Sequence, residues 1–167
     1  RDIKNHIYLE MSVLVFLTLI RMNKIALFPG SFDPFTKGHE YIVSKALEIF
    51  DEIVIGIGVN TEKKYLFDLE KRIKHIEQLY INDKRITIKP YQGLTIDFCK
   101  EVSASHIVRG LRNSIDFEYE KSIAQMNRSL SEVETLFILT SETLSPINSS
   151  IVREIHKNKG DISLFVT

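Results

Sequence analysis

The sequence predicts an α/β protein built on a five-stranded parallel sheet with helices on both faces. From residue 22 onward, short apolar runs alternate with longer amphipathic stretches, which is the order of elements that builds such a sheet. The apolar runs are continuous, as expected for strands that are buried on both faces. Parallel neighbours need crossover connections, and these are right-handed. A ligand is therefore expected beyond the carboxyl ends of the strands.

The elements follow from the run lengths and the spacing of apolar residues. Strands are predicted at 24–28, 53–59, 86–89, 106–109 and 135–139. The first helix is predicted at 38–50, because Ile42, Val43, Ala46, Leu47 and Phe50 share one face. The next is predicted at 67–81, because Leu69, Ile73, Ile76 and Tyr80 share a face. Three more helices are predicted at 95–103, 115–130 and 148–158, the last beginning at a possible N-cap cluster, Asn148-Ser149-Ser150.

Composition limits the classes of function. The chain has 167 residues, of which 44% are hydrophobic and 26% are charged, in the ordinary range of a globular protein. Its formal net charge is +0, which argues against a nucleic-acid or membrane partner. The lone cysteine, Cys99, excludes an intramolecular disulfide and suits a reducing cytoplasm. Because the net charge is +0, a site for an anion must be built from cations gathered locally.

The first residues need a separate interpretation. Residues 11–20 form an apolar run that is too short to span a bilayer as a helix, and no small-residue cleavage site follows. We expect residues 1–21 to be a non-native or upstream extension ahead of a start at Met22. A membrane-associating arm and an additional ordered element are the alternatives. Residues 22–167 are then expected to form one domain.

The segment from Phe28 to His39, Phe-Pro-Gly-Ser-Phe-Asp-Pro-Phe-Thr-Lys-Gly-His, is the most informative stretch. A buried strand is predicted to end at its first residue, and a helix to begin near Gly38. Backbone N–H groups, the positive end of the helix dipole and an imidazole would meet there, which suits a phosphate chain. The alternative is a histidine that only satisfies the helix start, with Asp33-Pro34 initiating a turn.

Cations follow several of the predicted strands. His39 follows the first, Lys63 and Lys64 follow the second, and Arg109 and Arg112 follow the fourth. Each taken alone is consistent with a solvated surface charge, but together they lie at one edge of the sheet. A neutral protein with this distribution is expected to bind a polyanionic small molecule.

The sequence lacks the motifs of several other classes of protein. The chain has no Gly-x-x-x-x-Gly-Lys-Ser/Thr, no Gly-x-Gly-x-x-Gly and no Gly-x-Ser-x-Gly, which argues against a P-loop, a dinucleotide fingerprint and a serine hydrolase. The spacing of His, Cys and carboxylate residues also gives no metal-ligand set, so no residue is assigned to a metal.

Several motifs together resemble a known family. Gly30-Ser31-Phe32-Asp33-Pro34 followed by Thr36-Lys37-Gly38-His39 resembles the T/S-x-G-H motif of the nucleotidyltransferase superfamily. More narrowly, the chain resembles the bacterial phosphopantetheine adenylyltransferases. That likeness rests on Arg109-Gly110-Leu111-Arg112, then Asp116-Phe117-Glu118-Tyr119-Glu120, Met126-Asn127-Arg128 and Asn148 to Arg153, in the family's order and spacing.

The resemblance implies a Rossmann-like nucleotidyltransferase domain over residues 22–167. It implies transfer of AMP from ATP to 4′-phosphopantetheine, giving dephospho-coenzyme A and pyrophosphate, in coenzyme A biosynthesis. Mg²⁺ would accompany ATP. The resemblance also implies a cytoplasmic homohexamer and feedback binding of coenzyme A.

The same resemblance implies roles for individual residues. His39 would stabilise the transition state. The acceptor would be held by Ser31, Lys63, Thr95 and Arg109. ATP would contact Ser31, Phe32, His39, Gly110, Leu111, Arg112, Glu120, Leu144, Ser145, Pro146, Ile147, Asn148, Ser149 and Ser150.

Two departures from the family pattern change the expectations. Asn148 stands where the family usually has Ser, and Leu144 stands where an aromatic residue is usual. We expect altered detail without loss of function, since Asn also donates hydrogen bonds. The family usually adds a helix after the segment around Phe165, so we expect this chain to be a fragment at its C-terminus.

The chemistry follows from the substrates. A phosphate acceptor is already a nucleophile near neutral pH, and no covalent nucleophile paired with a base is evident in the sequence. Direct in-line attack is therefore expected, with Lys63 and Arg109 at the attacking phosphate and His39 at the α-phosphate. The alternative is another T-x-G-H enzyme, a cytidylyltransferase or a nicotinamide mononucleotide adenylyltransferase. A non-enzymatic nucleotide-sensing domain would bind ATP without turnover.

Overall fold

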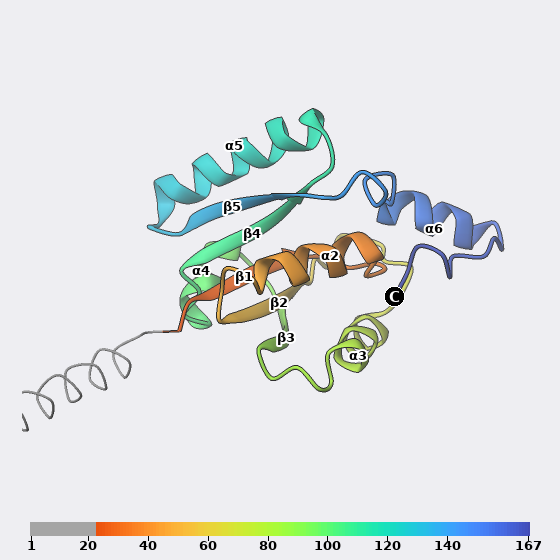
Figure 1. Cartoon of the computed structure of the whole chain (residues 1–167), viewed down its shortest axis with the longest axis horizontal. Helices are drawn as coiled ribbons and strands as arrows, with labels where there is room; N and C mark the ends of the chain where they lie inside the picture. Colours follow the sequence, from red (N-terminus) through yellow and green to blue (C-terminus); the bar gives the residue numbers. More distant parts are fainter. Residues whose placement is uncertain (1–22) are drawn as a thin grey trace, which may run out of the picture.

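The computed structural model describes residues 23–167, which contain a five-stranded sheet of order β3-β2-β1-β4-β5 (Figure 1). Every strand pairing in this sheet is parallel. The predicted fold class is confirmed. The expected extension over residues 1–21 lies outside the described residues. The strands are β1 (Ile25–Gly30), β2 (Glu52–Gly58), β3 (Ile86–Tyr91), β4 (His106–Leu111) and β5 (Glu134–Leu139).

Five helices connect and follow these strands, near the predicted positions. They are α2 (Lys37–Ala46), α3 (Leu69–Leu79), α4 (Thr95–Glu101), α5 (Ser114–Leu130) and α6 (Ser149–Lys157). All but α5 are shorter than predicted, and the difference is largest for α2 and α3. α2 ends at Ala46, and Phe50 is buried in the turn beyond it. α3 begins at Leu69 because the Asp68 side chain caps it, accepting a hydrogen bond from the Lys71 N–H at 2.8 Å.

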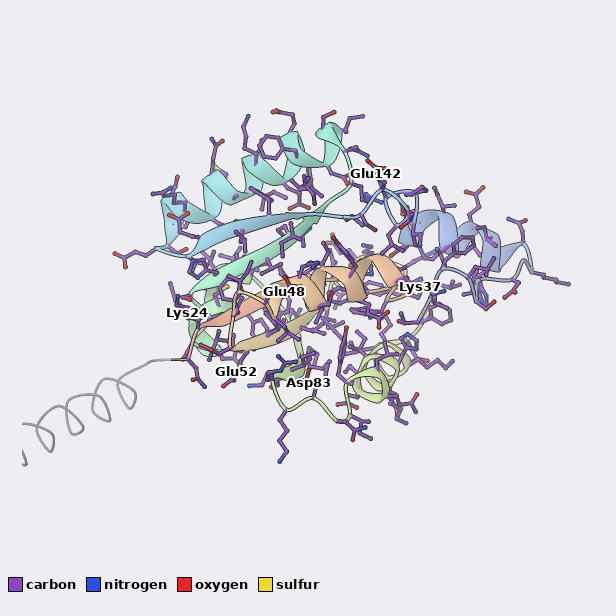
Figure 2. The ribbon with its side chains drawn as sticks, in the orientation of Figure 1. Lys24, Lys37, Glu48, Glu52, Asp83 and Glu142 are labelled. Carbon is purple, nitrogen blue, oxygen red and sulfur yellow. The ribbon has the colours of Figure 1, made fainter. Side chains whose placement is uncertain are left out.

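Alternating strand residues face two separate apolar layers. On one face, Phe28 and Ile55 pack with Ile42 of α2 and Ile76 of α3. On the other face, Leu27 and Val54 of the sheet pack with Phe98 of α4. Helix α5 covers this second face as well, since Phe117 meets Phe137 of β5 with ring centroids 5.7 Å apart. The helices therefore lie on both faces, and charged side chains such as Glu48 lie at the periphery (Figure 2).

The strand order places a topological switch at the carboxyl ends of β1 and β4. The chain moves outward from β1 to β2 and β3, and then returns to place β4 on the other side of β1. Loops that leave β1 and β4 therefore diverge in opposite directions, which opens a crevice between them. The predicted site residues at 31–39 follow β1, whereas those at 109–112 lie at the carboxyl end of β4, with residues 109–111 still in the strand.

Gly110 lets α2 approach the sheet closely. A Cβ added at Gly110 would lie 2.8 Å from Cγ1 of Ile42, a distance that would force one of the two elements to move. The absent side chain therefore sets the position of α2, and with it the position of His39, relative to β4.

No helix within residues 23–167 has both the length and the apolar content needed to cross a bilayer.

Candidate active site

Two adjoining cavities, of about 400 and 540 Å³, open at the switch point. The first cavity (the arm-side cavity) extends over β4 toward α4 and α5, and includes Thr95, Ile107 and Ile123 in its walls. The second (the helix-side cavity) lies at the starts of α2 and α6, and includes His39 and Asn148. Both share a common wall formed by Pro29, Gly30, Ser31, Lys63, Arg109 and Glu120.

His39 reaches the helix-side cavity from the first turn of α2. The N-cap of this helix is Thr36, whose backbone N–H donates to Nδ1 of His39 at 3.0 Å. Because Nδ1 accepts this bond, the proton of the neutral imidazole lies on Nε2. Nε2 has no hydrogen-bond partner within residues 23–167. The helix cap therefore leaves one N–H donor of His39 for a ligand.

The surroundings of His39 keep its ring neutral. Desolvation of the imidazole, followed by the nearby charges of Arg109 and Arg112, lowers the pKa of His39 to about 4. The ring of Phe32 lies edge-on to the imidazole, with centroids 5.1 Å apart, and Phe35 packs against it at 5.3 Å. The backbone of Phe32 has a φ of 48°, an uncommon conformation for an aromatic residue. Such strain is typical of a functional turn.

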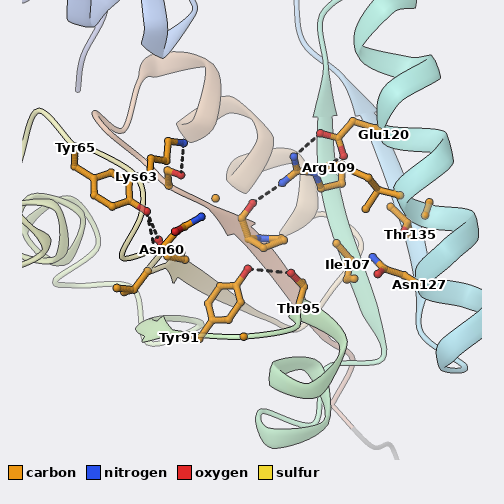
Figure 3. Close-up of a pocket in the computed structure, with 18 residues that line it drawn as sticks. Asn60, Lys63, Tyr65, Tyr91, Thr95, Ile107, Arg109, Glu120, Asn127 and Thr135 are labelled. Atoms are coloured by element: carbon orange, nitrogen blue, oxygen red, sulfur yellow. Dashed lines mark hydrogen bonds and ion pairs between the residues drawn. The ribbon is translucent and has the colours of Figure 1, made fainter.

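Arg109 stands in the wall between the two cavities. Its Nε donates to Glu120 at 2.8 Å, its Nη2 bonds the other oxygen of the same carboxylate, and its Nη1 donates to the Pro29 carbonyl at 2.5 Å (Figure 3). Glu120 thus fixes the guanidinium plane through a bidentate pair. Arg109 belongs to β4, and its partners Glu120 and Pro29 belong to α5 and β1. These two neighbouring elements therefore fix the position of its side chain.

Arg112 forms a second bidentate pair with Asp116, which lies one turn before Glu120 on α5. Its Nε and Nη2 donate to the two oxygens of Asp116 at 2.8 and 3.0 Å. Burial opposes ionisation of Asp116, but the hydrogen bond and charge of Arg112 outweigh it and leave the pKa of that carboxyl below its usual value. The helix face carrying Asp116 and Glu120 therefore orients both arginines toward the crevice.

Lys63 approaches the shared wall from the opposite side. Its Nζ lies 3.1 Å from Oγ of Ser31, so the loop after β2 and the turn after β1 meet there (Figure 3). Beyond this pair, the arm-side cavity continues past Thr95, whose hydroxyl lies 3.0 Å from the Tyr91 hydroxyl. The cavity therefore has a cationic end at the shared wall and another end lined by apolar and hydroxyl groups.

The start of α6 forms the far wall of the helix-side cavity. Asn148 is the N-cap, and its side-chain oxygen accepts from the Ser150 N–H at 2.7 Å. The Ser149 hydroxyl donates to the Pro34 carbonyl at 3.1 Å, which ties this helix to the turn after β1. Asn148 therefore caps α6 through its side chain.

Most of the predicted site residues come together, and four do not line either cavity. Leu111 is buried, with 4% of its surface exposed, and the Ser145 hydroxyl donates to the Arg112 carbonyl at 3.1 Å. Leu144 and Pro146 are also absent from both cavity walls. The sequence analysis missed Tyr65 and Tyr91, which line the arm-side cavity, and Arg153, which lines the helix-side cavity. Neither tyrosine belongs to a motif that would have indicated it.

A family model described as cytidylyltransferase-like matches residues 27–155, so the fold and site are those of this class of nucleotidyltransferase domain. Among curated relatives, phosphopantetheine adenylyltransferase from Flavobacterium psychrophilum is 52% identical over 141 residues, covering 84% of this chain and 93% of the relative. The one from Cytophaga hutchinsonii is 49% identical over 146 residues, covering 87% of this chain and 97% of the relative. The chain belongs to the phosphopantetheine adenylyltransferase family.

A solved structure supports the fold assignment independently. The bifunctional NMN adenylyltransferase/ADP ribose pyrophosphatase from Francisella tularensis aligns with a TM-score of 0.67 at 22% identity. The alignment covers 87% of this chain and 45% of that longer chain. At this level of identity the likeness concerns the fold alone.

Proposed function

We propose that this protein transfers the adenylyl group of ATP to 4′-phosphopantetheine, giving dephospho-coenzyme A and pyrophosphate. The observation that carries the proposal is the pair of cavities that share one cationic wall, since an enzyme that joins two anionic substrates needs such a junction. Family membership favours this reaction over the cytidylyltransferase and NMN adenylyltransferase alternatives, because the relatives at about 50% identity carry the phosphopantetheine adenylyltransferase name.

The acceptor is assigned to the arm-side cavity. Its phosphate would lie at the shared wall between Lys63 and Arg109, where two cations from different strand ends reduce repulsion between the substrates. Arg109 offers a planar donor edge, while Lys63 acts as a mobile point charge. The pantetheine arm would extend past Thr95 toward the apolar end of the cavity. The lining of this cavity, cationic at the shared wall and partly apolar beyond it, therefore fits an acceptor with a phosphate at one end.

ATP is assigned to the helix-side cavity. Its α-phosphate would lie near Nε2 of His39, and Arg112 and the N-terminal turn of α6 would face the remaining phosphates. A neutral imidazole that donates from Nε2 stabilises negative charge without releasing a proton. Because the helix cap fixes the ring beforehand, the donor needs little reorganisation as charge develops.

The chemical step is a direct in-line displacement. An oxygen of the acceptor phosphate forms a bond to the α-phosphorus of ATP, and the bond between that phosphorus and the bridging oxygen to the β-phosphate breaks. The electron pair leaves with pyrophosphate. No base is needed, since the acceptor phosphate is already ionised, and no residue of the chain is bonded to the nucleotide in this scheme.

Magnesium is proposed as part of the substrate, bound to ATP. Residues 23–167 contain no group of three or more His, Cys, Asp or Glu side chains arranged to hold a metal ion. Of the three carboxylates that line the two cavities, Asp116 and Glu120 each hold an arginine, and Asp33 accepts from two backbone N–H groups. The donor set therefore does not fit a resident Mg²⁺, whereas phosphate oxygens and water supply the ligands that this ion prefers.

A substrate panel tests the proposed function. The chain should be assayed with ATP or CTP, each in combination with 4′-phosphopantetheine or nicotinamide mononucleotide, with products identified by mass. We expect dephospho-coenzyme A from ATP and 4′-phosphopantetheine alone. Turnover confined to CTP or to the mononucleotide would support the alternatives, and ATP binding without any product would support the sensing domain.

Self-association, feedback and location extend the proposal. No residue of α5 is buried, and Ile115, Met126 and Leu130 on this helix are more than half exposed, as is Leu139 on the edge strand β5. Such a surface supports a homo-oligomer, and the family resemblance suggests a hexamer. Light scattering of the purified chain measures the number of copies in the oligomer.

Coenzyme A contains the same pantetheine arm as the acceptor, so it should compete with the acceptor in initial-rate assays. A cytoplasmic location is part of the same proposal.

A further inference from the structure

Arg72 is a buried charge that the proposed reaction does not use. It lies on α3 with 4% of its surface exposed, and it forms no ion pair with any carboxylate in residues 23–167. The charge of Arg72 acts on the Asp68 carboxylate only from a distance, without a hydrogen bond between the two side chains. Burying a guanidinium without a directly bonded carboxylate is costly unless its N–H groups are well satisfied. The contacts that satisfy Arg72 therefore indicate what this residue is for.

The guanidinium joins three segments of the chain. Its Nη1 donates to the Ser31 carbonyl at 2.6 Å, and its Nε donates to the Phe67 carbonyl at 3.1 Å. Its plane also lies over the ring of Tyr65, with the central carbon 4.1 Å from the ring centroid. One side chain thus connects α3 to the turn after β1 and to the loop over residues 59–68 (the Lys63 loop).

The same two segments are joined by further contacts. The Asp33 carboxylate accepts from the N–H groups of Leu66 and Phe67 at 2.8 and 2.9 Å. The Tyr65 hydroxyl donates to the Gly58 carbonyl at 3.3 Å and accepts from the Asn60 N–H at 3.0 Å, which returns the loop to the end of β2. These contacts close the Lys63 loop around the tyrosine ring, and Arg72 covers that ring.

We propose that Arg72 is a positioning residue for the acceptor phosphate. It holds the Lys63 loop against the turn after β1, and this sets the distance between the ammonium of Lys63 and the hydroxyl of Ser31. The inference rests on the proposed function, since it assumes that the anion at the shared wall is the acceptor phosphate. Arg72 itself lies in neither of the two cavities, so it acts through its neighbours.

A second arginine, Arg153, holds the same turn from the side of the crevice that is assigned to ATP. Arg153 of α6 donates to the Asp33 carbonyl at 2.7 Å and to the Ser150 hydroxyl at 2.8 Å. The turn after β1 is therefore held by Arg72 from the acceptor side and by Arg153 from the ATP side. Loss of Arg72 should mainly disturb acceptor binding, because the contacts of Arg153 remain in place.

The substitution Arg72→Lys tests the proposal. A lysine keeps the charge, but it lacks the planar fork that bonds two carbonyls while lying flat on a ring. We expect the KM for 4′-phosphopantetheine to rise by about tenfold or more and the KM for ATP to change by less than about threefold, the scale of one lost charge-assisted hydrogen bond acting on one substrate. Lys74→Met on the same helix is the matched control, because Lys74 is exposed and pairs only with Glu70, and it should leave both KM values unchanged.

A measurement that needs no activity separates this inference from the proposed function. Hydrogen exchange should be faster in Arg72→Lys at the N–H groups of Leu66 and Phe67, with β2 and β3 unchanged. If the wild-type chain shows no acceptor-dependent turnover but this exchange pattern holds, the proposed function fails while the structural link stands. Equal changes in both KM values, or faster exchange throughout the sheet, would overturn the positioning role and leave only a stability role.

A second variant covers the case in which Arg72→Lys does not fold. Tyr65→Leu removes the ring on which Arg72 lies and leaves both carbonyl bonds of Arg72 in place, but Tyr65 also lines the arm-side cavity and its hydroxyl bonds Gly58 and Asn60. Tyr65→Phe loses the same hydroxyl and keeps the ring, so it is the matched control. The KM for the acceptor should rise more in Tyr65→Leu than in Tyr65→Phe. An unchanged acceptor KM in a folded Tyr65→Leu protein would contradict the proposal.

Discussion

Replacement of His39 separates its two roles, as the cap of α2 and as a donor to the α-phosphate. Nδ1 accepts the Thr36 N–H at 3.0 Å, and Nε2 faces the helix-side cavity. Glutamine at the third helical position after a threonine N-cap is an ordinary capping-box residue. In His39→Gln its side-chain oxygen can take the Thr36 N–H, but its amide cannot then also reach the position of Nε2. His39→Ala removes both functions.

The magnitudes follow from these contacts. Losing one preorganised donor to the transition state costs about 2.7–4 kcal/mol, which lowers kcat by roughly 10²–10³. Losing the cap costs about 1 kcal/mol of folding stability. His39→Gln should therefore lose the activity and keep the stability within about 1 kcal/mol, whereas His39→Ala should lose both. The alanine variant also loses contact with the Phe32 and Phe35 rings, so its stability should fall further.

Three measurements test this reasoning. Steady-state kinetics give kcat, urea unfolding gives stability, and calorimetry gives ATP affinity, which should stay within a few-fold of the wild-type value because other groups also face the nucleotide. A kcat near the wild-type value in His39→Ala would remove His39 from the mechanism. A His39→Gln protein as unstable as His39→Ala would refute the role of Nδ1 in the helix cap.

Three further predictions concern the acceptor, the close approach of α2, and pH. Lys63→Ala and Arg109→Ala should each raise the KM for 4′-phosphopantetheine by about one to two decades and the KM for ATP much less, from the loss of a charge-assisted bond; a larger effect on ATP in assays that vary each substrate would reverse the assignment of the half-sites. Gly110→Ala should lower the free energy of unfolding by about 1–3 kcal/mol in urea and also reduce kcat, because its Cβ would press Ile42 and displace α2; a stable, fully active variant would show that α2 tolerates the shift. The pKa of His39 is about 4 in the fold against an ordinary 6.5, so below pH 6.5 the unfolded chain binds a proton that the folded chain does not. Stability should therefore fall as the pH drops from 6.5 toward 4, by at most about 3 kcal/mol from this residue, and the slope should be smaller in His39→Gln. An NMR titration of the imidazole with a pKa near 6.5 would contradict the prediction.

The fold was predictable because local pattern and topology agree. Continuous apolar runs marked the central strands β1 and β2, which are buried, and the alternation of such runs with amphipathic segments specified a parallel sheet. The edge strands β3 and β5 are only partly covered, which the same pattern did not predict. The residues near 31, 39, 109 and 112 could be assigned to one edge because they directly follow strands. The ends of the helices were less predictable: the apolar face of α2 continues to Phe50, but the helix stops at Ala46 and the aromatic ring is buried by the turn.

The parts of the site that sequence reasoning missed depend on tertiary contacts. Arg72 stands in a helix rich in exposed charges, and no local pattern distinguishes it from Lys71 or Lys74. Asp33 fits a turn before proline, yet its carboxylate bonds two N–H groups more than thirty residues away. Conversely, Leu144 and Pro146 lie in the loop that the family resemblance assigned to ATP, but they line neither cavity. Motif position alone does not fix which side chains face a ligand.

The central claim is that ATP and the acceptor react with each other at the shared cationic wall. The most direct test is to measure pyrophosphate release from ATP in the presence and absence of 4′-phosphopantetheine, with dephospho-coenzyme A quantified in the same samples. Release should require the acceptor, and the two products should form in equal amounts. Pyrophosphate released at the same rate without the acceptor, or no release with it, would show that the two substrates do not react at the shared wall.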